Sequence, residues 1–396
     1  MTYSFDEVID RRGQNSYKWN VGEQELPMWV ADMDFSTAPA IREVLERKVR
    51  HGVYGYMDIP DAWGEAYAGW WKTRHGFETK PEWYTFCTGV IPALSAAVRK
   101  LTTPGEKVLI QTPVYNHFYT SIRNNGRVVA ENRLIYEDGT YHMDLADLEH
   151  QLQDPQVTLM FLCNPQNPGG KIWSREILRQ VGEMCCRNHV VVVADEIHCD
   201  LTEPGLGYVP FASVSEECRR NSITCVAPTK TFNIAGIQTA AVMAADENLR
   251  HKMWRELNTS EVAEPNVFAI EAAIAAYTGG AQWLDDLREY LSQNKTYLRE
   301  KLAQALPEIA VTKNEATYLM WLDCGRITKQ TDELTAYIRK STGLYLSKGS
   351  QFGSGGERFI RWNVACPRAT LVDGIGRFIQ GVERFRKQDA ESVRGK

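Results

Sequence analysis

An acidic residue and a lysine each follow an apolar run that predicts a buried strand. Asp195 follows residues 190–194, which read Val-Val-Val-Val-Ala, and Lys230 comes shortly after a second expected strand at residues 222–227. Valine-rich runs of this length are typical of strands that are covered on both faces of a parallel sheet. Such sheets place their ligand site at the carboxyl ends of the strands. We therefore expect Asp195 and Lys230 to lie close together.

A lysine beside a carboxylate is the pair that pyridoxal phosphate chemistry needs. The lysine amine forms a Schiff base, and the carboxylate keeps the pyridine nitrogen protonated so that the ring withdraws electrons from the substrate's Cα. Each residue taken alone has an ordinary alternative. Asp195 could be a solvated strand end, and Lys230 could be a surface lysine.

Further motifs follow one another in a fixed order. Residues 164–170 read Asn-Pro-Gln-Asn-Pro-Gly-Gly, residues 195–198 read Asp-Glu-Ile-His, residues 229–233 read Thr-Lys-Thr-Phe-Asn, and residues 361–363 read Arg-Trp-Asn. This order resembles the fold-type I aminotransferase superfamily. Residues 31–35, Ala-Asp-Met-Asp-Phe, resemble its cystathionine β-lyase branch, the MalY/PatB family, rather than ordinary aminotransferases. The resemblance covers nearly the whole chain.

The elements that position these motifs have an α/β pattern. Strands and helices alternate from about residue 88 to residue 244, which favours a parallel-type sheet with helices on both faces. A chain of 396 residues is longer than most chains that fold around a single hydrophobic core, so we expect two domains. The resemblance implies an aminotransferase-like fold of type I with a mixed, mostly parallel sheet. We expect a large cofactor-binding domain at 46–285, and a smaller α+β domain formed by 1–45 and 286–396.

The resemblance also implies which residues hold the cofactor. Asp195 would pair with the ring nitrogen, Asn167 would bond the ring oxygen, and Tyr115 would stack on the ring face. The residue pair Gly89 and Val90 precedes a helical run, and a helix start can cradle a phosphate. The other residues that we expect to contact the cofactor, besides Lys230 itself, are His198, Thr229 and Tyr56.

Two departures from the family pattern leave the phosphate ligands open. Related enzymes often have a serine three positions before the lysine, where this chain has Ala227. Ordinary aminotransferases have an arginine eight positions after the lysine, where this chain has Gln238. Thr229 is left as the best local hydroxyl.

Arg361 lies within an apolar strand pattern, where an unpaired charge is costly, so it needs an anionic partner. A buried acid is one such partner. The resemblance instead makes Arg361 the clamp for the carboxylate of an α-amino acid, a role that suits the forked guanidinium group. Asn167 and the backbone around Met33 are the other substrate contacts that it implies.

The implied reaction is the α,β-elimination of a cysteine thioether. Cystathionine or a related cysteine S-conjugate would give a thiol, pyruvate and ammonia, with Lys230 removing the Cα proton. Either Tyr115 or Tyr56 would donate a proton to sulfur, and the sequence does not choose between them or identify the thioether. Two alternatives stay open, an aminotransferase on the same scaffold and a regulatory or binding protein that retains the fold.

Composition limits the partners and the location. A net charge of −5, with 43% hydrophobic and 24% charged residues, gives no reason to expect nucleic acid or a membrane as partner. The cysteines lack paired metal-type spacing, so we predict no metal site. The first residues do not read as a signal peptide, and we expect a cytoplasmic protein. The resemblance implies a homodimer with composite active sites, in which Tyr56 reaches the neighbouring subunit's cofactor.

Overall fold

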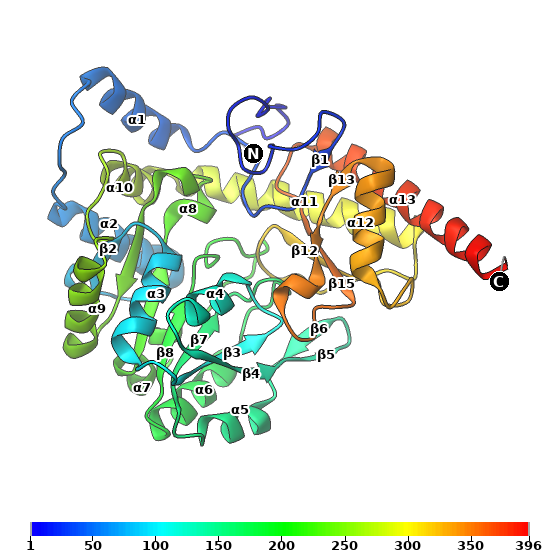
Figure 1. The fold of residues 1–396 in the computed structure, drawn as a ribbon. Helices are drawn as coiled ribbons and strands as arrows, with labels where there is room; N and C mark the ends of the chain where they lie inside the picture. The colour runs from blue at the N-terminus through cyan, green and yellow to red at the C-terminus, as the bar shows by residue number, and fades with distance from the viewer. Residues whose placement is uncertain (1, 395–396) are drawn as a thin grey trace.

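The valine-rich runs form the centre of a seven-stranded sheet in the computed structural model, which describes residues 2–394 (Figure 1). The strand order is β2-β10-β9-β8-β7-β3-β4, and β10 alone runs antiparallel to its neighbours. The mixed, mostly parallel sheet that we predicted is confirmed. Its strands are β2 (Tyr84–Cys87), β3 (Lys107–Thr112), β4 (Val128–Arg133), β7 (Val157–Cys163), β8 (Val191–Asp195), β9 (Ser222–Val226) and β10 (Ala240–Met243).

Successive strand residues point into two different cores, as the twofold repeat of a strand requires. In β3, Val108 and Ile110 pack into a core with one helical layer, whereas Leu109 between them packs into the core of the opposite layer. The first layer contains α3 (Val90–Leu101), α4 (His117–Arg123) and α9 (Glu247–Thr259). The second layer contains α5 (Leu145–Leu152), α6 (Arg175–Arg187) and α7 (Glu216–Arg220).

Several of these helices begin at a side-chain cap. Ser174 accepts a hydrogen bond from the backbone N–H of Ile177 at the start of α6, and Asp246 accepts one from Leu249 at the start of α9. Such caps satisfy backbone donors that a helix leaves free, and each contributes about 1 kcal/mol. Helix α6 therefore begins at Arg175, directly after its cap.

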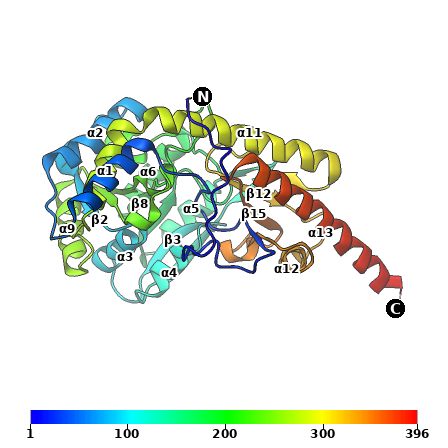
Figure 2. The ribbon, with the colours of Figure 1, turned by 90° about the horizontal axis from the view of Figure 1, so that it is seen from above.

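A further group of helices packs beside the β2 edge of the sheet. It consists of α1 (Pro39–His51), α2 (Asp61–His75) and α10 (Ala269–Gly279), and both α1 and α2 pack against α10. The long helix α11 (Ala281–Ala305) then crosses to the smaller body, as Figures 1 and 2 show. Helix α1, which contains the predicted boundary at residue 45, packs against α10 of the large body. The domain boundary stays a prediction.

The smaller body contains a four-stranded antiparallel sheet with the order β11-β12-β15-β14. Its core is formed with α11, α12 and α13. The amino-terminal segment joins this body, because β1 pairs with β13 in parallel. The elements are β1 (Leu26–Pro27), β11 (Ala310–Val311), β12 (Leu319–Asp323), α12 (Thr331–Thr342), β13 (Leu344–Tyr345), β14 (Ser347–Lys348), β15 (Phe359–Asn363) and α13 (Arg368–Arg394).

A hairpin of β5 (Ile135–Glu137) and β6 (Thr140–His142) extends from the large body.

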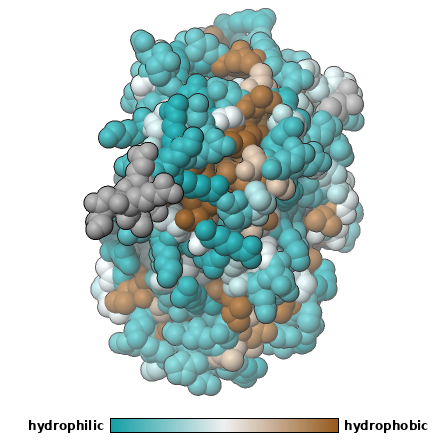
Figure 3. All heavy atoms as spheres, turned by 90° about the vertical axis from the view of Figure 1, so that its right-hand side faces the viewer, coloured by the Kyte–Doolittle hydropathy of each residue, from teal (hydrophilic) through white to brown (hydrophobic). Residues whose placement is uncertain are grey.

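The face that carries α12 and α13 is mainly hydrophilic, with a strip of hydrophobic atoms across it (Figure 3). Among residues 2–394, no helix is both long and apolar enough to span a bilayer.

Candidate active site

The site is a cavity of about 200 Å³ at the carboxyl ends of the central strands. Asp195 is the last residue of β8, Asn167 follows β7, and Tyr115 follows β3. Lys230 lies in the one-turn helix α8 (Pro228–Thr231), which comes after β9. The topology thus brings together side chains that lie far apart in the sequence. The predicted residues that line this cavity are Gly89, Val90, Tyr115, Asn167, Asp195, His198 and Lys230.

Lys230 is the third residue of α8 and follows β9, as the sequence pattern predicted. Pro228 occupies the first turn of α8, where its fixed φ suits a helix start. The Lys230 Nζ donates a hydrogen bond to the carbonyl oxygen of Ala31, at 2.5 Å. Burial lowers the pKa of Lys230 to about 8, although the negative charge of Asp32 opposes this effect. Lys230 therefore loses its proton far more readily than an ordinary lysine.

Asp195 is buried, and its Oδ1 accepts one hydrogen bond, from the backbone N–H of Ile197 at 3.2 Å. Burial raises the pKa of Asp195 to about 7, because the carboxylate has been removed from water. The hydrogen bond from Ile197 and the charge of Lys230 only partly offset this effect. A protonated ring nitrogen in the cavity would supply the positive partner that this carboxylate lacks.

Arg361 reaches the site from β15 of the smaller body. Its Nη1 donates to Asn167 Oδ1 at 3.1 Å, and its Nη2 donates to the carbonyl of Trp29 at 3.1 Å. No Asp or Glu among the described residues forms an ion pair with Arg361, and its Nε has no hydrogen-bond partner there. Burial lowers the pKa of Arg361 to about 10. A buried guanidinium group in this state favours an anionic ligand.

His198 and Tyr115 are neutral groups on the cavity wall. Burial lowers the pKa of His198 to about 3, and the imidazole Nδ1 has no hydrogen-bond partner among the described residues. Burial also raises the pKa of Tyr115 to about 12, so the phenol keeps its proton at neutral pH. His198 can therefore bond a ligand without adding charge, and Tyr115 can donate a proton.

The start of α3 forms another part of the wall. Gly89 is the N-cap residue, and no side chain caps this helix. Gly89, Val90 and Ile91 line the cavity. The free N–H groups and the positive end of the helix dipole make this start suitable for a phosphate group.

These features fit pyridoxal phosphate. Asp195, the Nδ1 of His198 and the uncapped start of α3 each lack a partner that the ring nitrogen, the ring substituents and the phosphate would supply. Lys230 lines the same cavity, and its amine would hold the cofactor covalently. The residues present can therefore bind this cofactor in one orientation.

Besides Arg361, three predicted residues are not among those that line the cavity. Tyr56 is fully exposed, in the segment between α1 and α2. Thr229 is next to Lys230 but is not among the residues that line the cavity. The Met33 side chain is buried in the core, and Ala31, two residues before it, lines the cavity instead. Their roles in binding stay predictions.

The sequence reading missed the residues that hold the lysine turn in place. Asp200 is buried and accepts hydrogen bonds from Trp70 Nε1 at 2.9 Å, from His75 Nε2 at 2.9 Å and from Thr231 Oγ1 at 3.0 Å. Burial raises the pKa of Asp200, but these hydrogen bonds outweigh burial and lower it overall. Asp200 thereby anchors Thr231, the neighbour of Lys230. Its position five residues after Asp195 gave no signal of this contact.

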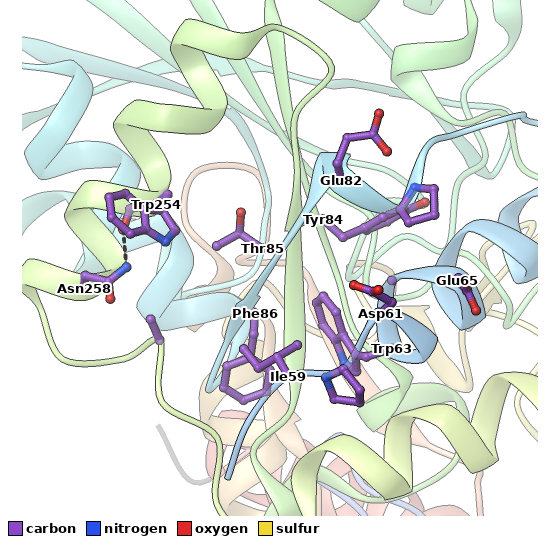
Figure 4. A pocket seen from close by; sticks show the side chains of 14 residues that line it. Ile59, Asp61, Trp63, Glu65, Glu82, Tyr84, Thr85, Phe86, Trp254 and Asn258 are labelled. Carbon is purple, nitrogen blue, oxygen red and sulfur yellow. Dashed lines mark hydrogen bonds between the residues drawn. The ribbon is translucent and has the colours of Figure 1, made fainter. Parts of the chain in front are cut away.

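A larger cavity of about 540 Å³ lies at the β2 edge of the sheet (Figure 4). Trp63, Tyr84 and Phe86 line it together with Asp61 and Glu82. None of the residues on its wall is a lysine, arginine or histidine. It therefore lacks both the amine and the cationic groups that an amino acid and a phosphate would need.

The chain is similar to known proteins along nearly its whole length. The sequence profile of the family "Aminotransferase class I and II" matches residues 26–378. The chain is similar to cystathionine beta-lyase PatB of Bacillus subtilis, with 43% identity over 380 residues, which cover 94% of this chain and 98% of PatB. It is also similar to protein MalY of Escherichia coli, with 32% identity over 97% of this chain and all of MalY.

A solved structure has a closely similar fold. The pyridoxal-phosphate-bound C–S lyase of Staphylococcus hominis, complexed with the inhibitor L-cycloserine, superposes with a TM-score of 0.90 and 31% identity. The match covers 96% of this chain and 99% of that enzyme.

Proposed function

Because this chain belongs to the aminotransferase class I and II family, we propose that it is a pyridoxal-phosphate-dependent carbon–sulfur β-lyase. Its substrate would be cystathionine or a related cysteine thioether, and its products a thiol, pyruvate and ammonia. The observation that carries the proposal is the hydrogen bond from Arg361, a buried guanidinium group, to Asn167. Asn167 lines the same cavity as Lys230 and Asp195. This arrangement suits an α-amino acid whose Cα must lose a proton beside a lysine. The lyase reaction is supported by the relatives that carry that activity in their names.

Arg361 would fix the substrate by its carboxylate. The guanidinium group has an unpartnered Nε and is already oriented by Asn167 and by the Trp29 carbonyl. A carboxylate that bonds Nε and a terminal nitrogen would be held in a plane. The Cα–H bond of the bound substrate would then have one fixed orientation toward Lys230, which lowers the entropic part of the activation barrier.

Lys230 and Tyr115 would move the protons. A lysine with a pKa near 8 is partly neutral near neutral pH, so its Nζ can accept the Cα proton. Bound pyridoxal phosphate supplies the electron sink for the pair left on Cα. When the Cβ–S bond breaks, sulfur leaves with that bond's electron pair and takes a proton, for which the neutral phenol of Tyr115 is a suitable donor. Water then converts the released enamine to pyruvate and ammonia.

The assembly would be a homodimer with two composite sites. A second exposed apolar strip, in the segment between α1 and α2, supports this part of the proposal, because exposed apolar surface on a monomer often marks an interface. It includes Val53, Tyr54 and Tyr56, which are 66%, 57% and 100% exposed. Tyr56 is not among the residues that line the cavity of its own chain, and it would reach the partner's site.

A cytoplasmic location is also part of the proposal. All nine cysteines are free thiols, and eight of them are buried. Unpaired cysteines in this number suit a reducing compartment. Cell fractionation with an antibody against the protein would test the location.

The test of the proposed reaction is a product assay without any added keto acid. The purified holoenzyme should convert cystathionine to pyruvate, ammonia and thiol in equal amounts, and Lys230→Ala should form none. Alanine with an acceptor keto acid is the control for transamination. If that pair turns over faster than every cysteine thioether tried, the protein is an aminotransferase and the lyase assignment is wrong.

A further inference from the structure

The segment from Met28 to Phe35 passes directly over the candidate site. On the large-body side, the carbonyl of Ala31 accepts hydrogen bonds from Lys230 Nζ at 2.5 Å and from the Tyr318 hydroxyl at 2.9 Å. Asn233, three residues after Lys230, bonds both the N–H and the carbonyl of Met33 at 2.9 Å. The backbone of this segment is therefore the direct neighbour of the reactive lysine.

The same segment also bonds the strand that carries Arg361. The carbonyl of Trp29 accepts hydrogen bonds from Arg361 Nη2 and from Ser347 Oγ, both at 3.1 Å. Asn363 Nδ2 donates to the carbonyls of Val30 and Asp32, both at 2.6 Å. Three residues of backbone, Trp29 to Ala31, thus connect the partner of Arg361 to the partner of Lys230.

A cluster of four charged side chains holds this backbone from its outer side. Arg11 spans the two carboxylates, with Nη2 2.7 Å from Asp32 Oδ2 and Nη1 2.7 Å from Asp34 Oδ1. Lys18 Nζ lies 2.7 Å from Asp34 Oδ2 and 3.4 Å from Asp32 Oδ1. We call Arg11, Lys18, Asp32 and Asp34 the N-terminal ion cluster.

The cluster is buried enough for its geometry to be restrictive. The side chains of Lys18 and Asp34 are 1% and 5% exposed, and Trp19 Nε1 donates a third hydrogen bond to Asp34, at 2.8 Å. Buried ions are costly unless their partners are well placed, so such a cluster favours one arrangement of the chain over others. Neither Arg11 nor Lys18 has a role in the reaction described above, although both form ion pairs with Asp32, the residue after Ala31.

We propose that the N-terminal ion cluster is a positioning device for the reaction, and this proposal rests on the proposed function. By fixing Asp32 and Asp34, the cluster holds the Ala31 carbonyl against Lys230 and the Trp29 carbonyl against Arg361. A carbonyl that accepts one N–H of the amine limits rotation about the Cε–Nζ bond and so restricts the directions in which the nitrogen lone pair can point. A carbonyl that accepts from Arg361 leaves the remaining donors of the fork facing the substrate. Arg11, Lys18, Asp32 and Asp34 are thus positioning residues that act through this backbone.

The test compares Arg11→Ala with Arg377→Ala. Arg377 anchors the same N-terminal segment through the carbonyl of Gln24 but does not contact the cluster. In the holoenzyme, Arg11→Ala should raise KM for a cysteine thioether about tenfold and lower kcat about tenfold, because both Arg361 and Lys230 lose their fixed acceptors. Arg377→Ala should keep both parameters within about twofold of wild type. If Arg11→Ala lowers thermal stability and kcat but leaves KM unchanged, the cluster is only structural.

A second measurement does not depend on turnover. In the cofactor-free protein, acetylation of Lys230 by acetic anhydride is followed by peptide mass spectrometry, with Lys171 as the internal reference lysine. Arg11→Ala should acetylate Lys230 about fivefold faster relative to Lys171, since the lysine loses its acceptor and its cover. Equal ratios in wild type and variant would overturn the positioning role whether or not the enzyme proves to be a lyase. Should Arg11→Ala fail to fold, Arg11→Lys, which keeps the charge but not the fork, is measured in the same way.

Discussion

Arg361 Nη1 lies 3.1 Å from Asn167 Oδ1, a hydrogen bond that joins the smaller body to the loop after β7. Asn167 lines the cavity, so this bond holds the Arg361 guanidinium group at the edge of the candidate site. The amide oxygen of Asn167 thereby orients the guanidinium group together with the Trp29 carbonyl, which accepts from Nη2.

The first prediction concerns Arg361. Arg361→Ala should raise KM for an α-amino acid substrate by about 2 to 5 kcal/mol of lost binding, because a desolvated charge pair is removed. The primary amide of the same substrate should lose much less, since it has no carboxylate. Steady-state kinetics with both substrates measures the difference.

Arg358→Ala is the matched control, because Arg358 is half exposed and pairs with Asp323 away from the cavity. It should leave KM unchanged. Equal losses for the acid and the amide in Arg361→Ala would mean that Arg361 only supports the fold.

The second prediction concerns Lys230. Lys230→Ala should abolish both the visible absorption of the bound cofactor and its covalent trapping by borohydride, because no other amine lines the cavity. Lys295→Ala is the control, since burial also lowers the pKa of Lys295 to about 8 and this lysine pairs with Glu203 instead. A trapped adduct in Lys230→Ala would show that another residue carries the cofactor.

The third prediction concerns the pH dependence of stability in the cofactor-free protein. Burial raises the pKa of Asp195 from 3.8 to about 7, so the ionised group destabilises the fold. This cost is absent below pH 3.8, grows as the pH rises to 7, and is constant above that. Asp195→Asn should therefore raise the free energy of unfolding at pH 8 by about 1 to 3 kcal/mol, with no gain near pH 4.

Urea unfolding from pH 4 to pH 8 measures this gain, and cofactor titration should show weaker binding for the same variant. A gain of equal size at both ends of the pH range would mean that Asp195 is not protonated in the way described.

Much of the fold and of the site follows from local sequence patterns. The apolar runs before Asp195 and Lys230 predicted neighbouring strands, and the parallel order of β8 and β9 brings their ends together. The parallel part of the sheet was therefore predictable from strand period and strand length, whereas the mixed sheet was expected from the family resemblance. Asn167 follows the same rule, because its motif comes directly after β7.

The remainder depends on contacts that no periodic pattern encodes. Arg11 and Lys18 lie in a segment without helix or strand, and their bonds to Asp34 are formed only after the chain has folded back on itself. The one-turn helix that carries Lys230 was not predicted, although Pro228 marks a helix start. Tyr56 was placed by resemblance alone, and a single chain leaves it exposed.

The last prediction is that Tyr56 acts in the partner's site. Subunits with Tyr56→Phe are mixed with subunits with Lys230→Ala, under conditions that exchange subunits. If Tyr56 acts across the interface, each hybrid dimer has one site with both lesions and one site with neither. A random equal mixture contains hybrids in about half of its dimers, so it should recover about a quarter of wild-type activity. If Tyr56 served its own chain, every site would keep one lesion and the mixture would not exceed the parent proteins. Size-exclusion chromatography with light scattering first establishes that the mixed species are dimers, and Tyr54→Phe subunits in place of Tyr56→Phe serve as the control, because Tyr54 lies on the same exposed strip.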